Sequence, residues 1–172
     1  MKNILTRLNL PGFLLLAITL GFVPIAASAQ ESASGHGTLL VTNEDGKTVR
    51  RQFSFSARRS ADGSVKGNAV LHNPAFEGAN GNKYQLQISI SCMNVIGNVA
   101  FFGGTTRRTN DPNLVGTVFF SVEDNGEPGR NADRISEVFF TSNNPDPQIC
   151  EDFPSGFFPT FPIESGNISI RD

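Results

Sequence analysis

The densest group of oxygen ligands in this 172-residue chain lies in one polar segment, residues 123–133. Asp124, Glu127 and Asp133 are its candidate metal ligands, because carboxylate oxygens of this kind suit calcium. The spacing does not match an EF-hand loop, and the Asn-Gly and Pro-Gly dipeptides are what a tight connection needs for backbone reasons. Arg130 would also neutralise the neighbouring carboxylates. We therefore favour a structural turn over a metal site, and we predict no cofactor.

Side chains that could carry out catalysis are sparse. The chain has two histidines, His36 between two glycines and His72 at the end of an alternating run. Neither stands in a nucleophile motif, and phosphate-loop and dinucleotide fingerprints are absent. A pair of carboxylates would serve a glycosidase, but the sequence does not single out a pair. We predict no catalytic residue, and we keep a glycan-active hydrolase or isomerase on a barrel as an alternative.

The chain has two cysteines, Cys92 and Cys150. An even number of cysteines in an oxidising compartment predicts one disulfide. It would close a loop of about 58 residues, which is worth roughly 4 kcal/mol on the chain-entropy model. A catalytic thiol and a zinc site are the alternatives, and the zinc site is the weaker because two cysteines and two isolated histidines lack ligand spacing.

The first 29 residues indicate the compartment. Lys2 and Arg7 precede an apolar run that ends in Ala27-Ser28-Ala29, the small residues that a signal peptidase reads. We predict a secretory signal peptide over residues 1–29, cleavage before Gln30, and a secreted or periplasmic protein. The alternative is a retained membrane anchor, which the prolines and glycines within the run disfavour.

Removal of the predicted signal peptide leaves 143 residues, enough for one domain with its own core. The formal net charge changes from −2 to −4, because the removed part holds two basic residues and no acidic ones. This balance argues against a general affinity for nucleic acid or anionic lipid, and leaves a cell-envelope or extracellular ligand as the expected partner. Three arginine pairs would clamp an anionic glycan, although such pairs are more often solvated strand ends. They are Arg50-Arg51, Arg58-Arg59 and Arg107-Arg108.

Most of the remaining chain consists of short runs with a period of two, separated by turn residues. The clearest run is 84–95, in which Tyr84, Leu86 and Ile88 share one face and glutamines and serines share the other. Further strands are expected at 36–42, 49–58, 64–72, 98–105, 115–123, 134–141 and 167–170. We predict an all-β domain over residues 36–172, a single antiparallel β-sandwich or flattened barrel of about eight strands, after a flexible stretch at 30–35.

A hairpin is expected within this series. Ile96-Gly97 has the form of a two-residue loop in which Gly97 supplies a positive φ. In that register Cys92 would lie opposite Phe101, and Ile90 would lie opposite Gly103.

Residues 143–163 interrupt the alternation with five prolines and four phenylalanines. Proline removes backbone donors, so this segment does not suit an inner strand. It is also too apolar for a solvated linker. We expect an irregular cover segment that is attached through Cys150 and packs its rings over one end or one face of the sheet.

The chain has four Phe-Phe pairs, at 101-102, 119-120, 139-140 and 157-158. They indicate which aromatic rings the cover segment could shield from water. Neighbours on a strand point to opposite faces, so one ring of each pair must meet water, a cover or a ligand. Either the cover segment hides these rings, or they line an apolar groove. The candidate groove residues are Phe102, Phe119, Phe139, Phe157 and Phe158.

Three segments of the chain combine turn and strand motifs in a fixed order. They read Cys-Met-Asn-Val-Ile-Gly-Asn-Val-Ala over 92–100, Asp-Asn-Gly-Glu-Pro-Gly over 124–129 and Gly-Asn-Ile over 166–168. With Cys150 before the last of them, they resemble the marker segments of a family of secreted bacterial all-β proteins of unknown function. The resemblance implies an exported single-domain β protein whose two cysteines pair, and it assigns no functional residue.

These observations favour an exported, non-catalytic β domain that binds or adheres, with no membrane insertion after signal cleavage. A carrier of a small apolar ligand in a Phe-lined groove is the first alternative. The glycan-active enzyme is the second.

Overall fold

The computed structural model describes residues 30–42, 45–77, 81–141 and 143–172, so the predicted signal peptide lies outside the described residues. One curled antiparallel sheet has the order β10-β1-β2-β3-β4-β5-β6-β7-β9, with β8 paired to β6. The strands are β1 (Ser32–Thr42), β2 (Thr48–Arg59), β3 (Val65–Glu77), β4 (Lys83–Ile96), β5 (Val99–Thr109), β6 (Thr117–Glu123), β7 (Arg134–Ser136), β8 (Phe139–Phe140), β9 (Thr160–Pro162) and β10 (Ser165–Arg171). Two short 3-10 helices are η1 (Pro112–Leu114) and η2 (Pro147–Asp152). The predicted all-β fold is confirmed.

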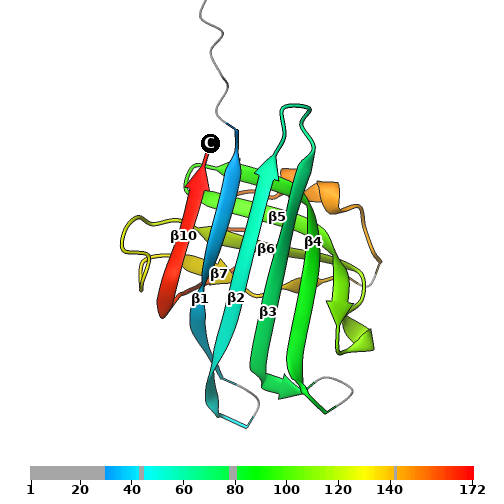
Figure 1. Cartoon of the computed structure of the whole chain (residues 1–172), viewed down its shortest axis with the longest axis vertical. Coiled ribbons are helices and arrows are strands. Elements are labelled where there is room, and N and C mark those ends of the chain that lie inside the picture. Colours follow the sequence, from blue (N-terminus) through cyan, green and yellow to red (C-terminus); the bar gives the residue numbers. More distant parts are fainter. Residues whose placement is uncertain (1–29, 43–44, 78–80, 142) are drawn as a thin grey trace, which may run out of the picture.

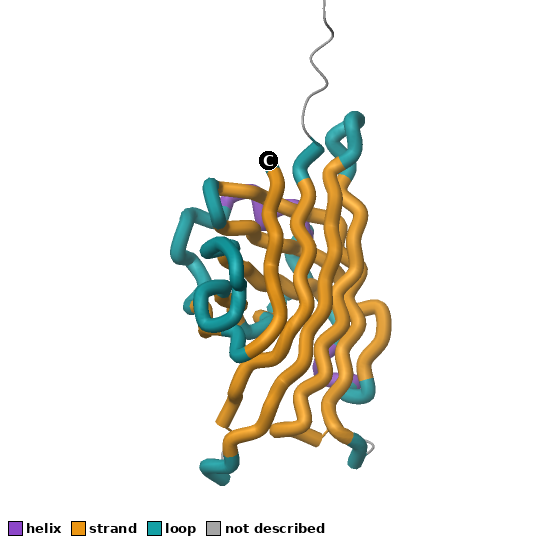
Figure 2. The backbone as a smooth tube through the Cα atoms, turned by 60° about the vertical axis from the view of Figure 1, so that its left-hand side comes forward, coloured by secondary structure: helices purple, strands orange, loops and turns teal. Residues whose placement is uncertain are grey.

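The sheet folds over on itself into two layers. In Figure 1, β10, β1, β2, β3 and β4 form the front layer, and β5, β6 and β7 cross behind it. Figure 2 brings the left side of Figure 1 forward and shows loops lying beside the strand that ends at the C-terminus, β10. The two ends of the curled sheet therefore meet across loops.

The main core lies between the two layers. Alternation along β2 turns Phe53 and Phe55 inward, where Phe55 meets Phe102 of β5 at a ring-centroid distance of 5.3 Å. Phe102 stacks on Phe120 of β6 at 4.7 Å. Gly35 of β1 faces the same space, and a Cβ atom there would lie 2.7 Å from the Phe55 ring. The front layer can lie this close to the aromatic core because β1 carries glycine at that position.

The stretch predicted to be flexible, residues 30–35, lies largely within a strand. β1 begins at Ser32, which is paired with Arg58 of β2 on one side and Arg171 of β10 on the other. Small side chains let β1 pair with β2 on one side and β10 on the other without steric crowding. The small-residue composition that predicted a flexible terminus is therefore also compatible with a central strand.

The β4–β5 hairpin forms one residue later than predicted. Its two-residue loop is Gly97-Asn98, because Ile96 still pairs with Val99, and Gly97 has the expected positive φ of 61°. With the loop at this position, Cys92 lies opposite Gly103 rather than Phe101, and an irregularity between Ile90 and Cys92 places Ile90 opposite Gly104 rather than Gly103. A local irregularity of this kind leaves no clear mark in an alternating pattern.

The run 134–141 forms two short strands instead of one. β7 and β8 both pair with β6, but the ladder breaks between them at Ser136. The Ser136 hydroxyl accepts a hydrogen bond from the Ser121 backbone N–H (2.8 Å) and donates to the Glu137 carbonyl (2.7 Å). A side chain thus replaces a backbone partner, and the chain turns away at Glu137.

The cover segment, residues 143–163, packs on the rear of the molecule as predicted. Cys150 in η2 forms a disulfide with Cys92 of β4, with Cα atoms 6.2 Å apart. Phe153 makes an edge contact with Phe119 at 5.2 Å and with Phe158 at 5.1 Å. The rearward rings of β5 and β6 are therefore covered by rings from this segment.

Candidate functional site

The five candidate groove phenylalanines lie on two sides of β5 and β6. Phe102 belongs to the main core, whereas Phe119, Phe139 and Phe158 belong to the rear cluster under the cover segment. Phe157 is 52% exposed and stacks on Phe153 at 4.6 Å. Among the five, only Phe139 and Phe157 contact another member, Phe158, and the five do not share one surface.

The three candidate metal ligands accept hydrogen bonds that fasten the 124–133 loop to the free edge of β10. The buried carboxylate of Asp133 accepts from the backbone N–H groups of Asn125 (2.9 Å) and Ile168 (2.7 Å). Asp124 accepts from the backbone N–H of Ile170 (2.9 Å), and Glu127 accepts from the side chain of Asn167 (2.7 Å). Asp124 and Asp133 thus satisfy two backbone donors at the edge of β10, as expected of a structural turn.

In the part of the chain that the structure describes, no three His, Cys, Asp or Glu side chains are grouped as a metal site.

The most open candidate site is the front of the sheet, which we call the outer polar face. Side chains along β2 point alternately inward and outward. Phe53 and Phe55 point inward, and Gln52, Ser54 and Ser56 point outward. The strand register aligns similar outward residues on the neighbouring strands. The face consists of Ser165, Asn167, Ser169 and Arg171 of β10, Ser34, His36 and Thr38 of β1, Gln52, Ser54, Ser56 and Arg58 of β2, Lys66, Asn68, Val70 and His72 of β3, and Gln85, Gln87 and Ser89 of β4. None of these residues is acidic, although the chain as a whole is.

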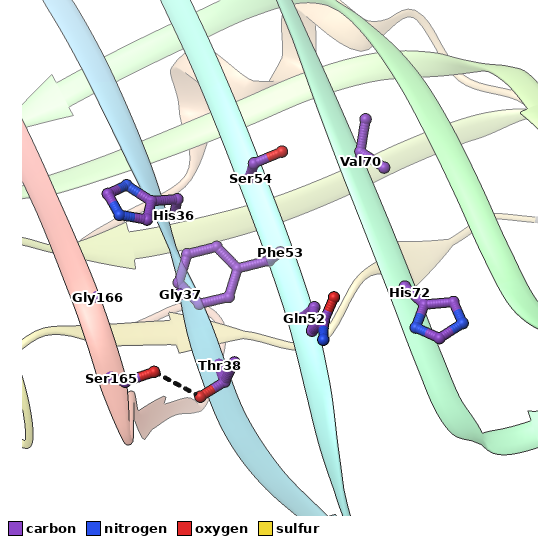
Figure 3. Close-up of a pocket in the computed structure, with 10 residues that line it drawn as sticks. All are labelled: His36, Gly37, Thr38, Gln52, Phe53, Ser54, Val70, His72, Ser165 and Gly166. Carbon is purple, nitrogen blue, oxygen red and sulfur yellow. Dashed lines mark hydrogen bonds between the residues drawn. The ribbon is translucent and has the colours of Figure 1, made fainter.

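Two shallow depressions follow one another along β1, β2 and β3 on this face. The first has a volume of about 470 Å³, and its lining includes His36, Gln52 and His72 (Figure 3). Gly37 and Phe53 also line it, and a Cβ atom on Gly37 would lie on the core side of β1, 3.1 Å from the Phe53 ring and 2.2 Å from the carbonyl oxygen of Ser165.

The second depression, of about 480 Å³, carries the positive charge of the face. Arg58 and Lys66 lie opposite each other on β2 and β3 and both line it. Neither forms a salt bridge among the described residues. The nearby carboxylate of Asp62 accepts hydrogen bonds from the Ser64 hydroxyl (2.7 Å) and backbone N–H, which lower its pKa, with a smaller effect from the charge of Lys66. Two cations therefore face solvent side by side.

At the other end of the front layer, an ion pair neutralises Arg50. Arg50 of β2 donates two hydrogen bonds to Glu164, of 2.7 and 2.8 Å. These bonds and the charge of each partner raise the pKa of Arg50 and lower that of Glu164. Arg50 therefore adds no free charge to the front layer, unlike Arg58 and Lys66 at the opposite end.

The fold brings the two histidines of the chain to the same depression, from β1 and β3. His36 lies one row from His72 in the register, with β2 between them. In residues 30–42, 45–77, 81–141 and 143–172, neither imidazole has a hydrogen bond to a serine hydroxyl or a carboxylate. Their ring nitrogens are available to a ligand on the face.

Sequence reasoning missed the outer polar face as a unit. Its signal is present in the runs 52–58, 66–72 and 85–89, whose alternate residues are never acidic and, apart from Val70, are polar. The runs form one surface only after strand pairing places them side by side.

Comparison with protein-family models, curated proteins and solved structures finds no match to this chain. The resemblance of the three marker segments therefore stays a prediction. Two of these segments meet in the structure, because Asn167 accepts a hydrogen bond from the Gly129 backbone N–H (3.0 Å) and Asp133 binds the N–H of Ile168. This contact gives a physical reason for the two motifs to occur together.

Proposed function

We propose that this chain is an exported, non-catalytic binding domain whose outer polar face binds an acidic polysaccharide. The observation that carries the proposal is the pair of unpaired cations, Arg58 and Lys66, on a face that lacks acidic side chains. Carboxylates of a polysaccharide are complementary to this charge.

Export is supported by two features. The first is the pattern of residues 1–29, which is typical of a signal peptide. The second is the Cys92–Cys150 disulfide, a bond that persists in oxidising compartments. Among the described residues there is also no helix whose length and hydropathy would let it cross a bilayer.

A glycan suits the chemistry of the face better than an apolar partner does. Hydroxyl, amide and imidazole groups both donate and accept hydrogen bonds, as sugar hydroxyls do. From Ser32 to Thr38 the two depressions extend along the strand for roughly 20 Å. The outward side chains of the face include no phenylalanine, tyrosine or tryptophan, and Phe53, which lines the first depression, is only 6% exposed. Recognition therefore depends on charge and hydrogen bonds, and binding should weaken as salt increases.

The test is a titration of the purified protein with polygalacturonate at low ionic strength. We expect the double variant Arg58→Gln/Lys66→Gln to bind about tenfold more weakly, a loss of about 1.4 kcal/mol. A matched control, Arg107→Gln/Arg130→Gln, removes the same charge at two arginines that line neither depression, and should change affinity less than about twofold.

Neutral dextran should not bind, and a DNA duplex should compete weakly, because the whole chain is acidic. An equal loss in both double variants would show that only net charge matters and would reject the proposed surface. Absence of binding to polygalacturonate, or tighter binding to DNA, would reject the proposed class of ligand.

A further inference from the structure

A third pocket opens between the two layers, at the end of the molecule where β2 begins, β3 ends and β4 begins. Its volume is about 360 Å³, within the range of small-molecule sites. Its apolar wall includes Leu71, Val138 and Phe140. It is separate from both depressions of the outer polar face, so what it binds does not depend on polysaccharide binding.

Arg51 places a buried charge in this pocket. The residue is 1% exposed, although it belongs to a strand whose inward neighbours are phenylalanines. One terminal nitrogen donates to the carboxylate of Glu137, and the other donates to the carbonyl oxygen of Ser136 (3.2 Å). The Nε–H group has no partner among the described residues. A buried donor without a partner costs free energy, and it calls for an acceptor from outside the chain.

A second unpartnered polar atom lines the same pocket. Tyr84 is 7% exposed, and its hydroxyl makes no well-aligned hydrogen bond within the described structure. Burial, with a contribution from the charge of Asp111, raises the pKa of this phenol well above its ordinary value, while nearby Thr109 opposes the shift. The hydroxyl therefore stays protonated and can donate a hydrogen bond to a ligand.

The charges around the opening restrict what can enter. Glu77, Asp111 and Glu137 also line the pocket, and the ammonium of Lys83 pairs with Glu77 (3.0 Å), so an anionic group would meet three carboxylates and one ammonium. Arg51 already shares its charge with Glu137. The arrangement favours a neutral acceptor over a carboxylate or a phosphate.

We infer that this pocket binds a small neutral molecule that carries a carbonyl or hydroxyl oxygen on an apolar ring or chain. The oxygen accepts from Arg51 Nε–H and from the Tyr84 hydroxyl, and the apolar part packs against Leu71, Val138 and Phe140. Binding would thus satisfy two buried polar groups that the chain itself leaves without partners.

Acetophenone is a suitable probe, since it combines an aromatic ring with one carbonyl oxygen. Its binding can be followed in ¹H–¹⁵N spectra through the Arg51 Nε–H resonance, identified by its loss in Arg51→Lys. We expect a saturable shift of this resonance. Ethylbenzene, which lacks the oxygen, and benzoate, which is anionic, should each bind more weakly. No saturable shift with acetophenone, or equal affinity for ethylbenzene, would overturn the inference.

Tyr84→Phe separates a ligand-binding role from a structural one. If the hydroxyl serves a ligand, the variant should be at least as stable as the parent in urea and should bind acetophenone about fivefold more weakly. A less stable variant with unchanged acetophenone affinity would show a structural hydroxyl and would contradict the inference.

Asp111→Asn tests the charge argument, because asparagine can still accept the hydrogen bond from the Asn113 N–H at the start of η1. It should strengthen benzoate binding about twofold to threefold and leave acetophenone binding unchanged. Unchanged benzoate affinity would reject the neutral class of ligand.

Discussion

The front and the rear of the sheet are built from similar strands and have opposite chemistry. On the front, β2 alternates between buried and exposed residues, and its outward side chains remain in water. On the rear, the first six residues of β6 are all buried, so both of its faces are covered. A strand with two apolar faces needs a second layer. The phenylalanine pairs of β5 and β6 therefore require the cover segment, whereas the serines and glutamines of β2 leave the front open.

The two regions also differ in how they are held. The front layer depends on strand pairing, which extends from β10 through β4. The cover segment contributes only the three-residue β9 to the sheet and is attached by ring contacts and the disulfide. Substitutions should therefore affect stability mainly at the rear and ligand binding mainly at the front.

The largest expected effect follows from removal of the disulfide. Cys92→Ala and Cys150→Ala should each lower the free energy of unfolding by about 4 kcal/mol, because the bond closes a loop of 58 residues. The double variant should lose no more than either single variant, since both remove the same bond. Urea denaturation measures all three. Independent, additive losses would mean that the two cysteines act separately.

Phe158→Ala should have the next largest effect, a loss of about 3 kcal/mol. Phe158 is buried and stacks on Phe139 at 4.5 Å. Its neighbour provides a matched control, because Phe157 is half exposed and its truncation should cost less than about 1 kcal/mol. Equal losses in the same urea experiment would show that the cover segment does not distinguish its two adjacent rings.

Asp133→Asn tests the fastening between the 124–133 loop and β10. It should cost about 2 kcal/mol, because a neutral amide offers one acceptor oxygen where the buried carboxylate receives two backbone N–H groups. Faster amide exchange at Ile168 should accompany the loss. The exposed Asp152→Asn serves as the control. If added calcium stabilised the parent and not the variant, the structural role would be wrong.

Ser56→Ala on the outer polar face should change stability by less than about 0.5 kcal/mol, since its outward hydroxyl has no hydrogen-bond partner among the described residues. The same substitution should weaken polygalacturonate binding, because Ser56 lines the second depression beside Arg58. A thermal melt and a binding titration of one sample distinguish the two effects. A large loss of stability would show that the front also depends on its polar side chains.

The smallest expected effect concerns Arg50 and Glu164. Because folding lowers the pKa of Glu164, the ion pair stabilises the protein above the unfolded pKa of a glutamate, near 4.3, and this contribution disappears as the pH falls through the folded pKa. At pH 7 the parent should unfold at a slightly higher urea midpoint than Glu164→Gln. At pH 2.5 the two midpoints should be equal. A constant difference would exclude the ion pair as the cause.

The features that could be predicted from the sequence are those encoded by neighbouring residues. Alternation at 49–58 and 84–95 places two strands, and the Pro/Phe composition of 143–163 indicates a cover. The turn at 124–129 follows from Asn-Gly and Pro-Gly. In each case the signal lies within a few residues of the feature that it predicts.

The features that could not be predicted depend on contacts between distant segments. Arg51 meets Glu137 only because β6 breaks its pairing at Ser136. His36 and His72 share a depression only through the register of three strands. The first and last strands also pair, with Ser32 opposite Arg171, and no local pattern reveals this.

A residue-level map of polysaccharide binding tests the central claim most directly. The measurement is a ¹H–¹⁵N titration of the labelled protein with a short oligogalacturonate. The difference between front and rear predicts saturable shifts at β1, β2 and β3, largest around Arg58 and Lys66, and none in the cover segment. Shifts concentrated in residues 143–163, or spread evenly over the molecule, would contradict the account.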